Sequence, residues 1–215
     1  MKLLLVAFFI SALVALSVIG LTGSASASSA CKTSKEKWVA CNAENEVLKE
    51  EKVEGTGGES TIRTANITID CKASALVTSY ILGLPIVSGL ATTTCAVAKP
   101  SGCSMSSAFE GEVSGALIGA VPGGPPEEEL TGKGAGELIT TIKITGCSVE
   151  GSYALAGKQI CRFGGSYETA QETHEVSCSG SCVGSKLKLG SENAEFTRTI
   201  VDRLASKGNW SIQLN

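Results

Sequence analysis

Hydrophobic and polar positions alternate with a period of two over much of this 215-residue chain. The clearest case is the stretch 138–163, in which polar residues separate Ile142 from Ile144, and Tyr153 and Leu155 follow the same pattern more weakly. A period of two places one set of side chains in the core and the other in solvent. Because glycine and serine lie between the two runs, the stretch predicts two strands joined by a short turn, and we take this hairpin as the centre of the fold.

Similar short apolar runs, bounded by glycine-rich turns, recur along the rest of the chain. Few segments show the repeat of an amphipathic helix. The pattern therefore predicts an all-β fold, an antiparallel β-sandwich or a partly closed barrel of short strands, preceded by an N-terminal signal-peptide helix. The further predicted strands lie at 44–54, 61–71, 109–121, 172–177, 186–204 and 208–214, with two or three short buried strands within 74–98.

Glycine and proline predict where these strands end. Gly55, Gly57 and Gly58 predict a turn. The segment 121–137 carries three of the five prolines and several glycines, so it predicts a long hairpin loop. A domain boundary near Gly124 is the alternative.

Residues 1–27 have the pattern of a secretory signal peptide. Lys2 precedes an apolar run, and small residues then lead to a cleavage position before Ser28. The alternative is an uncleaved membrane anchor, because the apolar run is long enough to span a bilayer. The remaining chain, 28–215, is predicted to be a single disulfide-stabilised β domain with a looped N-terminal arm at 28–45.

All nine cysteines follow the predicted cleavage position, and an exported chain with so many cysteines predicts disulfide bonds. Because nine is odd, at least one thiol is left over. Short separations favour bridges between neighbours in sequence, which leaves Cys71, on a predicted core strand, as the free thiol. Small residues precede Cys31, so lipidation of Cys31 as in a bacterial lipoprotein is an alternative, although the usual leucine is absent. The predicted pairs are Cys31–Cys41, Cys95–Cys103, Cys147–Cys161 and Cys178–Cys182.

The charge is nearly balanced, with 18 basic and 21 acidic residues and a net charge of −3. No basic patch stands out in the sequence, so nucleic acid is not an expected partner. A membrane is an expected partner only through an uncleaved signal peptide or a lipidated Cys31.

His174 is the only histidine, and therefore the only residue on which a Ser–His–Asp triad could be built. No Gly-x-Ser-x-Gly element accompanies it. His174, Cys178 and Cys182 are evenly spaced, but a structural zinc site needs four ligands, and the segment predicts strand and turn. We therefore expect a surface histidine beside a disulfide, and no catalytic residue, metal or cofactor.

Two groups of glutamates could suggest the paired carboxylates of a glycosidase. The pair in 110–112 would point the same way on a strand, and three consecutive glutamates occupy 127–129 in the predicted loop. We expect both groups to be solvated. A carbohydrate-binding face would need exposed aromatic rings, but most aromatic residues lie within strand patterns and are expected in the core. Clustering of Tyr80, Tyr153 and Trp210 on the surface would favour ligand binding.

Several short motifs of structural type are spread over the mature chain: Ile-x-Ile-x-Cys at 67–71, Gly-Cys-Ser at 146–148 with a hairpin closing at Cys161, the segments 174–178, 184–190 and 194–196, and Trp-Ser at 210–211. In these motifs the chain resembles a group of uncharacterised exported cysteine-containing all-β proteins of high-GC actinobacteria. The likeness covers most of the mature chain and is best in its second half. Cys182, close behind Cys178, departs from the group's pattern. The resemblance implies export and β architecture, and it implies no catalytic residue because no activity is established for the group.

These observations predict a non-enzymatic protein that is secreted or held in the cell envelope and has a structural or binding role. One alternative is a secreted ligand- or carbohydrate-binding β-sandwich. The other is a membrane-anchored lipoprotein attached through Cys31.

Overall fold

The computed structural model describes residues 28–33, 50–81, 84–118, 124–165, 167–168, 171–179 and 182–214. In these ranges the regular structure is β-strand throughout, so the all-β prediction is confirmed. No helix in the described residues could cross a bilayer. The predicted signal peptide at 1–27 lies outside the described residues. The strands are β1 (Ser28–Thr33), β2 (Glu50–Arg63), β3 (Thr68–Ile81), β4 (Leu84–Lys99), β5 (Ser104–Met105), β6 (Ala108–Ile118), β7 (Glu127–Gly132), β8 (Leu138–Thr145), β9 (Gly151–Phe163), β10 (Thr173–Cys178), β11 (Lys186–Leu189), β12 (Glu192–Leu204) and β13 (Asn209–Leu214).

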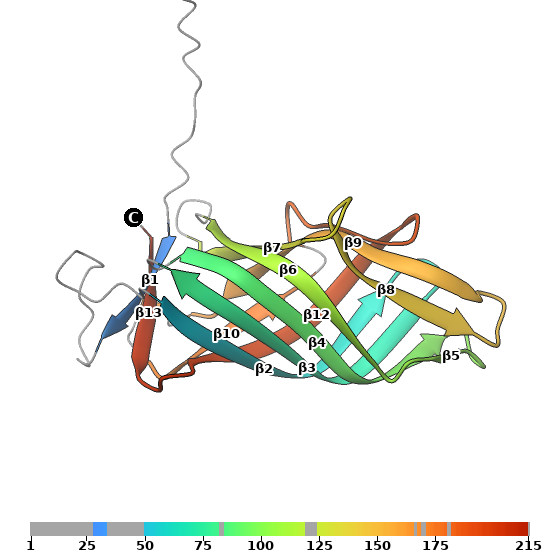
Figure 1. Cartoon of the computed structure of the whole chain (residues 1–215), viewed down its shortest axis with the longest axis horizontal. Helices are drawn as coiled ribbons and strands as arrows, with labels where there is room; N and C mark the ends of the chain where they lie inside the picture. Colours follow the sequence, from blue (N-terminus) through green and yellow to red (C-terminus); the bar gives the residue numbers. More distant parts are fainter. Residues whose placement is uncertain are drawn as a thin grey trace, which may run out of the picture.

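The main sheet closes on itself. Its path runs β10-β12-β2-β3-β4-β6-β7-β9, and β9 then pairs with β10 again. The short strand β11 fills the same seam, because it pairs with both β9 and β12. The sequence predicted either an antiparallel β-sandwich or a partly closed barrel, and these antiparallel pairings form a barrel. Figure 1 shows its long strands wrapping around an elongated interior, with β5 and β8 at one end and the small β1–β13 sheet at the other.

The interior follows from the alternation of each strand. On β12 every second residue is buried, from Ala194 to Leu204, and full burial of a large apolar side chain stabilises a fold by about 1.5 to 3 kcal/mol. At the end that carries β13, Trp210 is fully buried and meets the ring of Phe163 edge-on, with ring centroids 6.5 Å apart. The apolar face predicted for the last strand is confirmed at Trp210 and Ile212.

One inward-facing row of residues crosses eight strands without a break. Each member is paired in register with the next, and all are buried. We call this row the cysteine belt; in order from β6 to β4 it consists of Leu117, Glu128, Cys161, Cys178, Arg198, Ser60, Cys71 and Cys95. The last member of the belt, Cys95, lies close to the beginning of β6, because its amide donates a hydrogen bond to the Ser107 carbonyl. Ser107 precedes Leu117, the first member of the belt, by about ten residues, so the two ends of the belt meet β6 at different heights. Such a stagger is what closing a twisted sheet requires.

Two disulfides lie in the belt and a third lies at the end that carries β5. Cys71–Cys95 and Cys161–Cys178 join directly paired residues, with Cα–Cα distances of 4.0 and 4.1 Å. Cys103–Cys147 ties the connection before β5 to the β8–β9 turn, next to the pairing of Ser104 with Thr145.

Three of the predicted disulfide pairs are therefore wrong: Cys95–Cys103, Cys147–Cys161 and Cys178–Cys182. Cys71 is bonded rather than free, and Cys182 is the free cysteine among the described residues. The reason is strand length. β9 begins at Gly151 and pairs with β8 only as far as Ala156. Cys161 lies about 30 Å further along the strand than Gly151, and there the neighbouring strand is β10. Cys41 lies outside the described residues, so Cys31–Cys41 stays a prediction.

The central hairpin is confirmed, since β8 and β9 pair in antiparallel register and Ile142, Ile144 and Leu155 are buried. Several other boundaries differ from the prediction. The predicted loop 121–137 contains β7, because alternate residues from 126 to 132 face inward. The predicted looped arm 28–45 begins with β1, which pairs with β13.

The predicted turn at Gly55, Gly57 and Gly58 is wrong, because all three lie within β2. The segment 74–98 is not a set of short strands but belongs to two long ones, β3 and β4. Gly55 and Gly57 serve close packing inside a long strand rather than ending it. At Gly55, for example, a Cβ would lie 2.2 Å from Asp202 Oδ1.

Candidate functional site

Within the described part of the chain, three acidic or basic side chains other than a histidine lie inside the barrel. Glu128 on β7 and Arg198 and Asp202 on β12 are 1%, 3% and 3% exposed. The local sequence places them there because Leu130 shares the inward face of β7 and Ile200 shares that of β12. A charge buried among apolar side chains costs several kcal/mol unless it is paired, so this cluster is an expensive feature of the fold.

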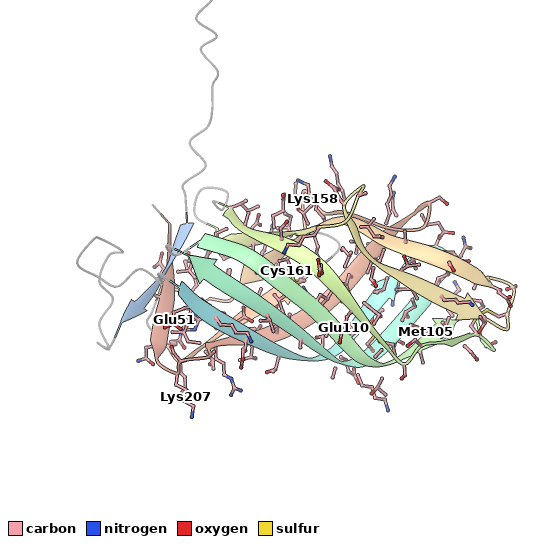
Figure 2. The ribbon with its side chains drawn as sticks, viewed as in Figure 1. Glu51, Met105, Glu110, Lys158, Cys161 and Lys207 are labelled. Carbon is pink, nitrogen blue, oxygen red and sulfur yellow. A yellow bond between two sulfur atoms is a disulfide. The ribbon has the colours of Figure 1, made fainter. Side chains whose placement is uncertain are left out.

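The contacts of the cluster leave polar atoms without partners. Arg198 Nε donates a hydrogen bond to Cys178 Sγ over 3.3 Å, and its guanidinium carbon lies 5.0 Å from the centroid of the Phe196 ring. Within the described part of the chain, Arg198 Nη1, Glu128 Oε1 and Asp202 Oδ1 are buried without a hydrogen-bond partner. Figure 2 shows the belt residue Cys161 away from both ends of the barrel, with Lys158 of the same strand pointing outward.

Burial sets the protonation states of the cluster. It raises the pKa of Glu128 to about 8, and the charge of Asp202 adds to the rise while that of Arg198 opposes it. Burial also raises the pKa of Asp202 to about 7, again opposed by Arg198, and lowers the pKa of Arg198 to about 10, opposed by both carboxylates. Near neutral pH Arg198 is therefore charged, Glu128 is mostly protonated and Asp202 titrates.

Small residues make room for the cluster. Gly55 is paired in register with Asp202, and a Cβ at Gly55 would lie 2.5 Å from Ile200 Cγ2. A Cβ at Gly57 would lie 2.5 Å from Ser74 Oγ, which is also buried without a partner among the described residues. The interior thus combines ionisable groups, hydroxyls and glycines at mid-barrel.

His174 is buried, and the expectation of a surface histidine is wrong. It is 4% exposed, because the alternation of β10 directs it inward. Its Nε2 lies 2.6 Å from the carbonyl oxygen of Trp210, which can only accept, so Nε2 carries the proton. Its ring also meets the Trp210 indole edge-on at 4.6 Å. Burial lowers the pKa of His174 and the hydrogen bond opposes this, so the imidazole is neutral at pH 7.

A polar recess of about 330 Å³ lies beside His174. The described residues place no hydroxyl, thiol or carboxylate in hydrogen-bond contact with the imidazole, so they hold no base–nucleophile pair there. Cys178 is oxidised in its disulfide and is not a thiolate ligand beside His174. Among the described residues no group of three His, Cys, Asp or Glu side chains is placed to hold a metal. The recess is lined by Gly164, Gly165, Gln171, Thr173, His174, Glu175 and Val201.

A larger groove of about 580 Å³ lies where the β2–β3 turn meets β11 and the start of β12. Its walls are held together by Glu192, whose carboxylate accepts hydrogen bonds from Asn66 Nδ2 at 2.6 Å and from the Asn66 backbone amide at 3.4 Å. The side-chain hydrogen bonds from Asn66 and Thr64 lower the pKa of Glu192. The charged residues that line the groove are Arg63, Lys186, Lys188 and Glu195.

The aromatic side chains do not form an exposed platform in the described part of the chain. Trp210 is fully buried, and Tyr153 is half-buried with its hydroxyl donating to the Val149 carbonyl at 2.7 Å. The side chain of Tyr80 lies outside the described residues. The two glutamates in 110–112 are exposed on β6 as expected, and they border a shallow hollow of about 500 Å³ over β3, β4 and β6.

The sequence reasoning missed the interior cluster, although β12 contained the signal. Ala194, Phe196, Ile200 and Leu204 share one parity, and Arg198 and Asp202 fall on the same parity. Two charged residues on the apolar side of an alternating strand are therefore the sequence mark of buried charges. Glu128 was placed in a solvated loop, and that interpretation is wrong because the loop contains β7.

No family model, curated protein or solved structure matches the chain. The resemblance to exported actinobacterial proteins therefore stays a prediction.

Proposed function

We propose that the chain is an exported, non-enzymatic module of the cell envelope or the extracellular medium, with a structural or binding role. The observation that carries the proposal is the set of three disulfides between strands or turns far apart in sequence. Structural disulfides form and persist in oxidising compartments and are rare in the cytosol. The set is compatible with an extracellular environment.

The size of the disulfide loops supports the same proposal. Closure of disulfide loops of this size stabilises a fold by about 3 to 4 kcal/mol each, mainly by restricting the unfolded chain. An export signal at 1–27 and kinship with exported actinobacterial proteins belong to the same proposal.

The test is the intact mass of the protein produced with its own N-terminus in a secreting host. We expect a chain that begins at Ser28 and contains at least three disulfides, counted by alkylation with and without reduction. Added lipid mass on Cys31 would support the lipoprotein alternative. A protein that stays in the cytosol with its six belt and turn cysteines reduced would contradict the proposal.

A binding role is favoured over a purely structural one by the groove beside β11. It combines a volume in the range of small-ligand sites, about 300 to 1,000 Å³, with several charged side chains. A ligand- or carbohydrate-binding role through an aromatic platform has less support, because Trp210 and Tyr153 are engaged within the fold.

A further inference from the structure

The groove beside β11 is lined by more positive than negative side chains, although the chain as a whole has a negative net charge. Three exposed cations, Arg63, Lys186 and Lys188, and one exposed carboxylate, Glu195, line it, whereas the net charge of the chain is −3. Within the described residues none of these three cations makes an ion pair, whereas the neighbouring Lys158 is held 2.6 Å from a glutamate oxygen. The three charges are therefore available to a ligand.

The spacing of the cations suits a row of anions rather than one anion. Lys186 and Lys188 share the outer face of β11, because Leu187 is buried between them, and alternate residues of a strand are about 7 Å apart. Arg63 lies across β12, opposite Glu195, so it is two strand spacings, or about 10 Å, from β11.

The groove is also held in shape before any ligand arrives. The hydrogen bonds between Asn66 and Glu192 fasten the β2–β3 turn to the β11–β12 hairpin. Ser185 Oγ accepts from the Ile160 amide, which leaves the hydroxyl proton to donate. No aromatic ring is among the residues that line the groove, and single-stranded nucleic acids depend on stacking with such rings.

We propose that this groove binds a linear polymer with phosphate or carboxylate groups repeated along its length, so that two of these groups can meet the two lysines about 7 Å apart. The inference deepens the binding role proposed above and rests on it. Arg63 supplies a fork of donors that matches either oxyanion, and the two lysines act as point charges. Glu195 is the opposing charge, so its removal strengthens binding.

The experiment is isothermal titration calorimetry of the purified, oxidised protein with linear polyphosphate and with polygalacturonate at low salt. Loss of two charge-assisted contacts in Lys186→Gln/Lys188→Gln weakens binding at least about tenfold. Glu195→Gln tightens it. The matched control Lys133→Gln/Lys143→Gln, which removes two exposed charges outside the groove, leaves the affinity unchanged. Inorganic phosphate alone binds far more weakly than either polymer.

The titrations with the two polymers show which oxyanion the groove recognises. Binding of polyphosphate alone identifies phosphate as the recognised group, and binding of polygalacturonate alone identifies carboxylate. Three results would overturn the proposal: no binding of either polymer, equal losses in the groove and control variants, or tighter binding of a single-stranded oligonucleotide. Circular dichroism of each variant checks folding. Because binding is measured on purified protein, failure of export in a cell would not be mistaken for failure of the groove.

Discussion

Replacing Glu128 with glutamine should change how the stability of the protein depends on pH. The carboxyl group has a folded pKa of about 8 against an ordinary value of 4.5, because it is buried beside Asp202. The folded state therefore holds this proton more tightly than the unfolded state. The stability that this group contributes is complete below about pH 4.5 and is lost as the pH rises through 8.

The magnitude follows from the size of that difference. Each pH unit between the two values is worth about 1.36 kcal/mol, so ionisation of Glu128 costs on the order of 4 kcal/mol by pH 8 once its coupling to Asp202 is discounted. Glutamine has nearly the shape of the protonated acid and does not titrate. Glu128→Gln should thus match the wild type near pH 5 and exceed its free energy of unfolding by several kcal/mol at pH 8.

The assay is urea unfolding at several pH values between about 5 and 8, followed by tryptophan fluorescence, to which Trp210, fully buried in the folded state, contributes. Titration of His174 is common to both proteins and cancels in the difference. Glu110→Gln, at an exposed position on β6, is the matched control and should give a flat difference. If the difference between Glu128→Gln and wild type is also flat across this range, the assignment of a buried, protonated acid is refuted.

Three further predictions concern packing and the cysteines. Gly55→Ala should cost about 1 to 3 kcal/mol of unfolding free energy, because its Cβ would lie 2.2 Å from Asp202 Oδ1, whereas Gly89→Ala, where a Cβ meets nothing within 4 Å, should be neutral or slightly stabilising; equal effects in urea unfolding would contradict this packing. Cys71→Ala/Cys95→Ala should lower the free energy of unfolding by about 3 kcal/mol, since it opens a loop of 24 residues, and an unchanged urea midpoint would argue against the bridge. Cys182 is half-buried and free, so mass spectrometry after brief alkylation of the native, unreduced protein should find label on Cys182; label on Cys161 or Cys178 under the same conditions would show that the belt is not oxidised as described.

Strand type was predictable because it depends on alternation within a few residues. Ile142, Ile144 and Leu155 show their inward parity in the sequence, and the hairpin they predict is present. The number and length of strands were less predictable, since the long strands β2 and β4 contain glycines, and β4 also a proline, of the kind that usually end short strands.

Disulfide pairing could not be predicted from sequence spacing. The partner of Cys161 is set by the strand that lies beside the far end of β9, and that neighbour is decided by closure of the whole barrel. The candidate cluster has the same origin. Parity on β12 can place Arg198 and Asp202 inside, but only the closed sheet brings Glu128 of β7 close enough for its charge to raise the pKa of Arg198 and for the charge of Asp202 to raise its own.

The strand β9 is shared among more neighbours than an ordinary strand. Along its thirteen residues it pairs with β7, β8, β10 and β11. An insertion or deletion of one residue within β9 would leave the residues before the change in register with their partner strands and shift those after it by one position. Every side chain beyond the change would then point to the opposite face of the sheet. As this protein diverges among species, length variation should accumulate in its connecting turns, and the interval from Gly151 to Phe163 should keep a constant residue count.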